Sequence, residues 1–150
     1  PAPMANDGVM TAWVKALAIL AWADGNLDSK EIKRLSIDAV AFAGMDLGSI
    51  EKLFDDARAW ARDLSSVARE IEPIRGSDLA QGLTHLKRCY ELAMSDGVED
   101  PTEIKIIEQL AALFVPTDRV AKVVPWLRAT RQAALLEAEL LPKGRPLPGR

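Results

Sequence analysis

The sequence has few residues suited to covalent or nucleophilic chemistry. Cys89 is the only cysteine in 150 residues, so no intrachain disulfide is possible and a reducing compartment is the simpler inference. His85 is the only histidine, so a Ser-His-Asp triad would have to pass through it. The net charge of −3 lacks the basic excess that is typical of nucleic-acid-binding proteins.

Long hydrophobic runs are also missing. The longest, Met10 to Ala23, contains Lys15 and is too short to span a bilayer. Residues 1–8 carry no positively charged segment of a signal peptide. These features predict a cytoplasmic protein without a transmembrane segment.

Motifs of familiar enzymes and metal centres are absent as well. The sequence contains no phosphate loop, dinucleotide fingerprint or nucleophile elbow. His85 and Cys89 are four residues apart on one helix face, which permits two metal ligands, but a zinc site needs at least one more such residue. We therefore interpret them as a partly buried histidine and a core cysteine.

The composition and hydrophobic periodicity predict an all-α protein. The apolar fraction is 49%, with many Ala and Leu and fewer β-branched residues, which favours helices. We expect a compact bundle of about seven helices and no strand, with helices near residues 7–23, 29–42, 49–64, 65–72, 78–95, 101–114 and 118–141. We further expect a flexible arm over 1–6, one domain over 7–141 and a disordered tail over 142–150, which is rich in proline, glycine and basic residues.

Prolines and glycines refine these boundaries. Pro73 should stop the fourth helix, leaving a break at 73–76, and Pro125 should kink or split the last helix near Val124. Gly82 lies inside a helix, where close packing against another helix could explain its presence.

The same pattern predicts helix caps and core positions. Asp46 or Ser49 should cap the third helix, and Thr117 or Asp118 the last. Leu79 is expected to face inward, and the four tryptophans are expected in the core: Trp13, Trp22, Trp60 and Trp126.

An acidic motif occurs twice, 72 positions apart. Residues 24–31 and 96–103 share the pattern acidic-Gly-x-x-Asp-x-x-Glu, and each copy lies between two apolar helical runs. Residues 20–46 match residues 92–118 at 11 of 27 positions, including Phe42 with Phe114 outside the motif. This predicts two helix-loop-helix units, within half-repeats of about 7–72 and 77–141, related by an approximate twofold axis.

The motif is not a standard EF-hand. If Glu31 is the last ligand of a twelve-residue loop, the first and third positions are Leu20 and Trp22, which have no side-chain oxygen to bind calcium. Most motif residues instead fit helix capping, because the glycine suits the end of one helix and the Asp and Glu suit the start of the next.

Asp24 and Asp96 are the motif residues that helix capping does not explain. Each follows a helix C-terminus, where the helix dipole disfavours a negative charge. Either their carboxylates reach forward to the N–H groups of the following helix, or they contribute to a site for Ca²⁺, Mg²⁺ or Mn²⁺. The candidate metal ligands, if the twofold axis brings the loops together, are Asp24, Asp28, Glu31, Asp96, Asp100 and Glu103.

The repeated motif resembles the tellurite-resistance TerB family. The resemblance lies in Ala23-Asp24-Gly25 with Glu31 and in Ser95-Asp96-Gly97 with Glu103, each followed by an apolar helix. It implies an all-α pseudo-repeat, acidic residues proposed to bind metal, and a role in bacterial stress or chemical resistance. It also implies protein partners and a location often close to the inner face of the membrane.

Three functions remain open from the sequence. The first is a non-enzymatic TerB-like module that binds other proteins and a divalent cation. The second is a metal-assisted hydrolase, which needs at least two of Asp24, Asp28, Asp96 and Asp100 in one pocket. The third is a structural module that forms a homodimer through exposed apolar helix faces. Five basic residues near the end of the chain favour a solubilising tail over contact with an anionic lipid or an acidic partner: Arg128, Arg131, Lys143, Arg145 and Arg150.

Overall fold

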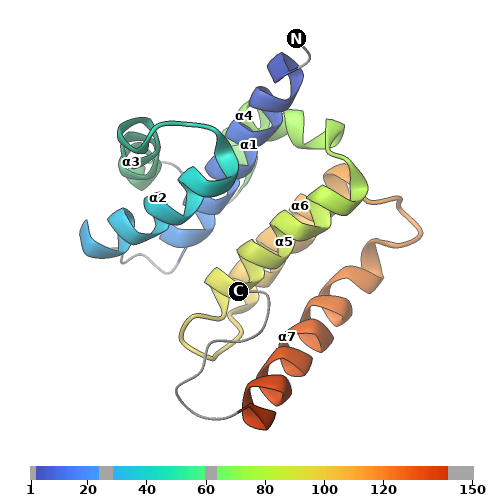
Figure 1. Ribbon diagram of the computed structural model, residues 1–150. Helices are drawn as coiled ribbons and strands as arrows, with labels where there is room; N and C mark the ends of the chain where they lie inside the picture. The colour runs from blue at the N-terminus through green and yellow to red at the C-terminus, as the bar shows by residue number, and fades with distance from the viewer. Residues whose placement is uncertain (1–2, 24–28, 60–63, 142–150) are drawn as a thin grey trace.

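The computed structural model describes residues 3–23, 29–59 and 64–141, and in this part of the chain helices are joined by turns and short loops (Figure 1). It contains seven α-helices and no strand, which confirms the all-α bundle predicted from the sequence. The α-helices are α1 (Pro3–Trp22), α2 (Ser29–Ala43), α3 (Leu47–Asp56), α4 (Ala68–Ile71), α5 (Leu79–Ala93), α6 (Pro101–Phe114) and α7 (Val123–Leu140). Four short 3₁₀ helices join them: η1 (Ala57–Ala59), η2 (Leu64–Val67), η3 (Glu72–Gly76) and η4 (Val120–Lys122).

Helix α1 is the centre of the bundle. Every residue from Ala12 to Trp22 is buried except Lys15, which is half-buried. The helix packs against α2, α3, α4, α5 and α6, so its apolar residues cover its whole circumference. It begins at Pro3, earlier than the start near residue 7 that the sequence predicted. From Ala12 to Trp22 the first helix is therefore enclosed on all sides, whereas the sequence predicted a single broad stripe.

Helices α2 and α3 form a hairpin on one side of α1. Gly44 adopts a left-handed conformation with a φ of 67° and allows the turn between them. Asp46 then caps α3, because its Oδ1 accepts a hydrogen bond from the Ser49 backbone N–H at 2.8 Å. This bond lowers the pKa of Asp46 and confirms one of the two predicted caps.

The segment after α3 differs from the expectation of a long third helix. Helix α3 ends at Asp56 and continues only as η1, while residues 60–63, with Trp60, lie outside the described residues. Helix α4 ends at Ile71, before Pro73 as expected, but residues 73–76 are not a break, because they belong to η3 with Pro73 in its first turn. Proline is tolerated there, since the first N–H groups of a helix have no partner inside it. Ile71 and Ile74 are buried, so this segment packs against the core.

Helices α5 and α6 form a second hairpin. Asp78 caps α5 by accepting from the Gln81 N–H at 3.1 Å. Gly82 is buried against α6, and a Cβ built there would lie 2.4 Å from Cε2 of Phe114. The close helix packing inferred for this glycine is confirmed. Leu79, in contrast, is 38% exposed and does not face the core.

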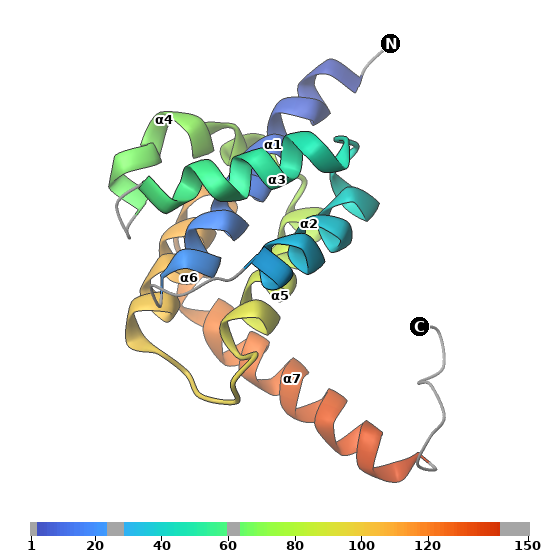
Figure 2. The same cartoon turned by 90° about the vertical axis from the view of Figure 1, so that its left-hand side faces the viewer.

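Helix α7 begins differently from its prediction. Neither Thr117 nor Asp118 caps it; it follows η4 directly, and no side chain caps its start at Lys122. The break expected near Val124 falls between Lys122 and Val123, and Pro125 lies inside the first turn of α7, where it displaces no helical hydrogen bond. The second half of α7 extends away from the bundle (Figure 2).

The tryptophans occupy different environments. Trp13 is 1% exposed, and its indole N–H donates to Ser77 Oγ at 3.0 Å. Trp22 is buried and donates to the Phe54 carbonyl at 2.7 Å, with the Arg58 guanidinium 5.1 Å from its ring centre. Trp126 is 37% exposed, so its predicted place in the core is wrong.

Candidate functional site

The second acidic loop has a backbone that is fixed by turns. Met94 caps the end of α5, and the Gly97 N–H donates to the Met94 carbonyl at 2.9 Å. Gly97 has a φ of 81°, a conformation that glycine adopts at low cost, as predicted for a residue just past a helix end.

Asp96 and Asp100 both bond to backbone N–H groups. Asp96 Oδ1 accepts from the Val98 N–H at 2.9 Å, forming a turn within the loop itself. Asp100 Oδ1 accepts from the Thr102 N–H at 2.7 Å and the Glu103 N–H at 3.4 Å, which makes it the cap of α6. Asp96 is exposed, and within the described part of the chain its Oδ2 accepts no hydrogen bond. One carboxylate oxygen of Asp96 thus stabilises the loop and the other faces solvent.

Glu99 ties this loop to α5 and α7, a role that the sequence analysis missed. Its carboxylate accepts two hydrogen bonds from Arg128, at 2.7 and 2.8 Å, and a third from the Tyr90 hydroxyl at 2.8 Å. The Arg128 bonds lower the pKa of Glu99. Burial and the Glu99 hydrogen bond raise the pKa of Tyr90.

Arg131 makes a second connection from α7. Its guanidinium lies 2.6 Å from Glu91 of α5 and also donates to the Met94 carbonyl at 3.4 Å. Arg128 and Arg131 are therefore paired within the protein. Acidic partners far away in the sequence offset both charges. The other basic residues of the predicted surface, Lys143, Arg145 and Arg150, lie outside the described residues, so that surface stays a prediction.

The described residues include only the end of the first acidic motif. Asp24 and Asp28 lie outside the described residues, while Glu31 is exposed in the first turn of α2. Helices α1 and α5 pack together and run toward the same end of the molecule (Figures 1 and 2). Both helices that precede an acidic loop therefore end on one side of the bundle.

The six predicted metal ligands remain a prediction. Asp96 and Asp100 share one loop, Glu103 is half-buried in the first turn of α6, and Glu31 is on α2. Among the residues that the structure describes, no three His, Cys, Asp or Glu side chains are grouped to hold a metal ion. The full set includes Asp24 and Asp28, so this finding does not test it. The predicted twofold relation between the half-repeats also stays a prediction.

His85 and Cys89 belong to the core, as interpreted from the sequence. His85 is 7% exposed, stacks near Trp13 with ring centres 5.2 Å apart, and lies 3.0 Å from the Arg88 guanidinium through Nδ1. Because arginine only donates, Nδ1 is the acceptor in this contact. Burial, assisted by Arg88, lowers the pKa of His85 to about 4. Burial raises the pKa of Cys89 to about 12, so its thiol is unreactive near neutral pH.

A groove of about 490 Å³ lies between α2 and α5, over α1. Its apolar surface comes from three leucines, and charged side chains surround it: Leu17, Leu35 and Leu92, with Arg34, Asp38, Lys87, Arg88 and Glu91. The groove lies close to the second acidic loop, because Ser95 also lines it. It offers an apolar surface with charged edges but no nucleophile paired with a base.

The fold and the acidic loop define a class of small all-α bundles that carry acidic turns between helices. Within that class, the protein-family model described as "Tellurite resistance protein TerB" matches residues 10–122. The chain therefore belongs to the TerB family. No curated protein and no solved structure matched the chain. No helix in the described residues is long and apolar enough to cross a membrane.

Proposed function

We propose that this TerB-family chain is a non-enzymatic binding module of a bacterial stress or tellurite-resistance-type system. In this proposal it binds protein partners in the cytoplasm or at the inner face of the membrane. Its two acidic loops together bind a divalent cation. The ligands come from the six residues named from the sequence, with Asp24 and Asp96 as the ones that helix capping does not require.

The observation that carries the cation proposal is the second acidic loop. Gly97, Glu99 and the cap at Asp100 fix its backbone, yet one oxygen of Asp96 faces solvent. A rigid loop that presents a carboxylate oxygen loses little conformational entropy on binding an ion. Carboxylate and carbonyl oxygens suit Ca²⁺, Mg²⁺ or Mn²⁺. The shared direction of α1 and α5 supports convergence of both loops on one ion.

Two observations support partner binding rather than catalysis. The groove between α2 and α5 has an apolar surface with the cations Arg34 and Lys87 at its edge, which suits an acidic amphipathic segment. The titratable side chains with the largest pKa shifts, His85 and Cys89, are packed in the core. Cys89 is 1% exposed, and His85 lines a small pocket of about 260 Å³ in which its lowered pKa leaves the imidazole neutral near pH 7.

Isothermal titration with Ca²⁺, Mg²⁺ and Mn²⁺ tests the cation proposal. We expect binding heat with at least one ion in the natural sequence and none after the double substitution Asp24→Asn with Asp96→Asn. The matched control is Asp55→Asn with Asp118→Asn, which removes the same charge from two exposed positions elsewhere and should leave the heat unchanged. Absence of heat with all three ions contradicts the proposal, and so does heat that survives the loop substitutions.

A further inference from the structure

The outer face of α7 carries an apolar stripe that nothing in the described part of the chain covers. Its residues recur at alternating spacings of three and four, as in the seam of a coiled coil: Trp126, Ala129, Ala133, Leu136 and Leu140. All five are exposed, with Trp126 at 37%, Leu136 at 50% and Leu140 at 84%. The inner face, with Val123, Val124 and Leu127, is already buried. Helix α7 is thus apolar on two faces and uses one of them in the bundle.

A groove next to Trp126 extends this stripe onto the bundle. The groove has a volume of about 340 Å³ and lies between α5, the end of α6 and the start of α7. Apolar residues make up most of its lining, and three charged residues complete it: Leu79, Leu83, Val115, Val123 and Trp126, with Asp118, Arg119 and Lys122. Leu79, whose exposure contradicts the sequence prediction, is part of this surface.

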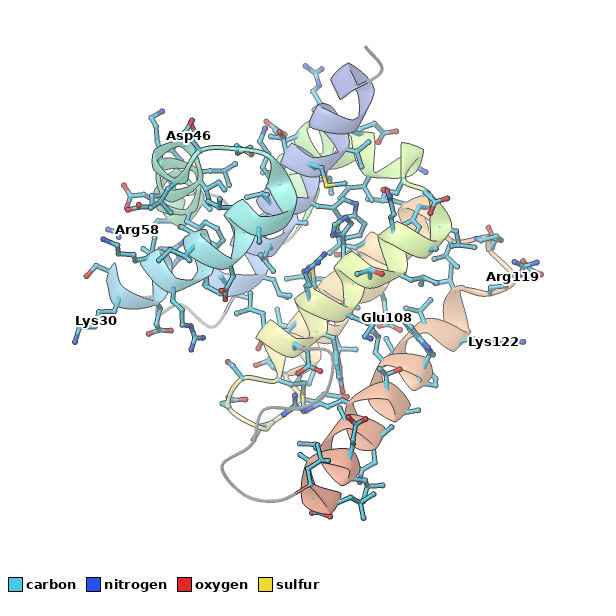
Figure 3. The ribbon with its side chains drawn as sticks, viewed as in Figure 1. Lys30, Asp46, Arg58, Glu108, Arg119 and Lys122 are labelled. Carbon is cyan, nitrogen blue, oxygen red and sulfur yellow. The ribbon has the colours of Figure 1, made fainter. Side chains whose placement is uncertain are left out.

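The charges at the two ends of the stripe have opposite signs. Glu137 and Glu139 flank the stripe near the end of α7, and Arg119 and Lys122 precede it. Figure 3 shows Arg119 and Lys122 pointing away from the bundle. None of these four side chains forms an ion pair within residues 3–23, 29–59 and 64–141. A second α7 laid antiparallel on the first would place each pair of glutamates against the basic residues of the other copy.

We propose that the stripe pairs with the same stripe of a second copy of this chain, in an antiparallel and symmetric arrangement. Residues 126–136 span about 15 Å at 1.5 Å per residue, and the two stripes overlap over this length when Ala129 of one copy lies opposite Ala133 of the other. Ala129 and Ala133 lie near the twofold axis, where small side chains allow two helices to approach closely. Leu136 and Leu140 of each copy then pack on Trp126 and the adjoining groove of the other.

Measurement of molar mass as a function of concentration tests this pairing. Sedimentation equilibrium of the full chain should show a monomer–dimer equilibrium. Leu136→Ser with Leu140→Ser should weaken it by about 100-fold, because two partly exposed leucines lose their apolar contacts. Leu135→Ser is the matched control: Leu135 is 48% exposed on the same helix but lies off the stripe, so dimerisation should persist. These residues are exposed in the monomer, so circular dichroism should show all variants folded.

A charge exchange tests the antiparallel orientation. Glu137→Lys with Glu139→Lys in one chain, and Arg119→Glu with Lys122→Glu in another, should each be monomeric alone, because like charges then meet at both ends. Mixed, the two chains should form a heterodimer, because opposite charges meet at both ends again. If the chain is a monomer at every concentration, or if Leu136→Ser with Leu140→Ser does not weaken the dimer, the proposal is overturned. A chain that dimerises only after removal of residues 142–150 also overturns it and identifies those residues as the cover of the stripe.

Discussion

Replacement of Gly82 by alanine sets two effects of opposite sign against each other. Alanine in a helix interior gains about 1 kcal/mol over glycine from backbone propensity alone. At Gly82 the new methyl group would lie 2.4 Å from Cε2 and 2.8 Å from Cδ2 and Cζ of Phe114. The ring of Phe114 rests edge-on against buried Trp13, with centres 5.6 Å apart. The ring must move for the methyl group to fit.

Overpacking of this kind costs typically about 1–3 kcal/mol. Since the Phe114 contact is far below any normal carbon–carbon distance, we expect the upper part of that range to apply. The propensity gain offsets about 1 kcal/mol. Gly82→Ala should therefore lower the free energy of unfolding by about 1–2 kcal/mol net.

Urea denaturation followed by tryptophan fluorescence measures this change. Gly8→Ala is the control, because Gly8 is exposed in α1 and a Cβ there meets nothing within 4 Å. It should stabilise the protein by about 0.5–1 kcal/mol. In a Phe114→Leu background, Gly82→Ala should lose most of its cost. If Gly82→Ala stabilises as much as Gly8→Ala does, the argument from close α5–α6 packing is wrong.

Three further outcomes follow from single contacts. The pKa of His85 falls from 6.5 in the unfolded state to about 4 in the folded state. As the pH falls, the unfolded state therefore binds a proton at His85 before the folded state does. The stability that is present above pH 6.5 is then lost as the pH falls toward 4. Between pH 7.5 and 5 the loss should be about 2 kcal/mol in urea titrations, and His85→Gln should remove this pH dependence. Asp100→Ala should cost about 1 kcal/mol by loss of the α6 cap, measured as a lower melting temperature. Glu99→Gln should speed hydrogen exchange in α7 without unfolding the bundle. Because the pKa of Glu99 is lowered, wild-type α7 should loosen in the same way as acid protonates that carboxylate.

Local chemistry made much of the fold predictable. Caps such as Asp46, Asp78 and Asp100 act within three residues of sequence, so side-chain type and spacing indicate them directly. Gly82 and Gly97 were likewise interpreted correctly, because glycine has few structural uses inside or just after a helix.

Tertiary contacts account for what the sequence did not predict. Glu99 and Arg128 are 29 residues apart, and no periodicity links them. Leu79 and Trp126 fit a buried pattern by type, yet both line an open groove. Helical propensity alone also gave no indication that α3 would end at Asp56 or that residues 72–76 would form a 3₁₀ helix. For the metal site, the sequence supplied the residues, and four of the six lie in the described part of the chain.

The proximity of the two acidic loops is the central claim of this account, and a distance between them tests it most directly. Spin labels at Asn26→Cys and Val98→Cys occupy equivalent positions of the two motifs, and native Cys89 is 1% exposed and should not react. Pulsed electron resonance should give a short distance between the labels. The distance distribution should narrow when Ca²⁺ or Mg²⁺ is added, and Asp24→Asn with Asp96→Asn should abolish the narrowing. A long, broad distribution that no cation changes would contradict a shared site.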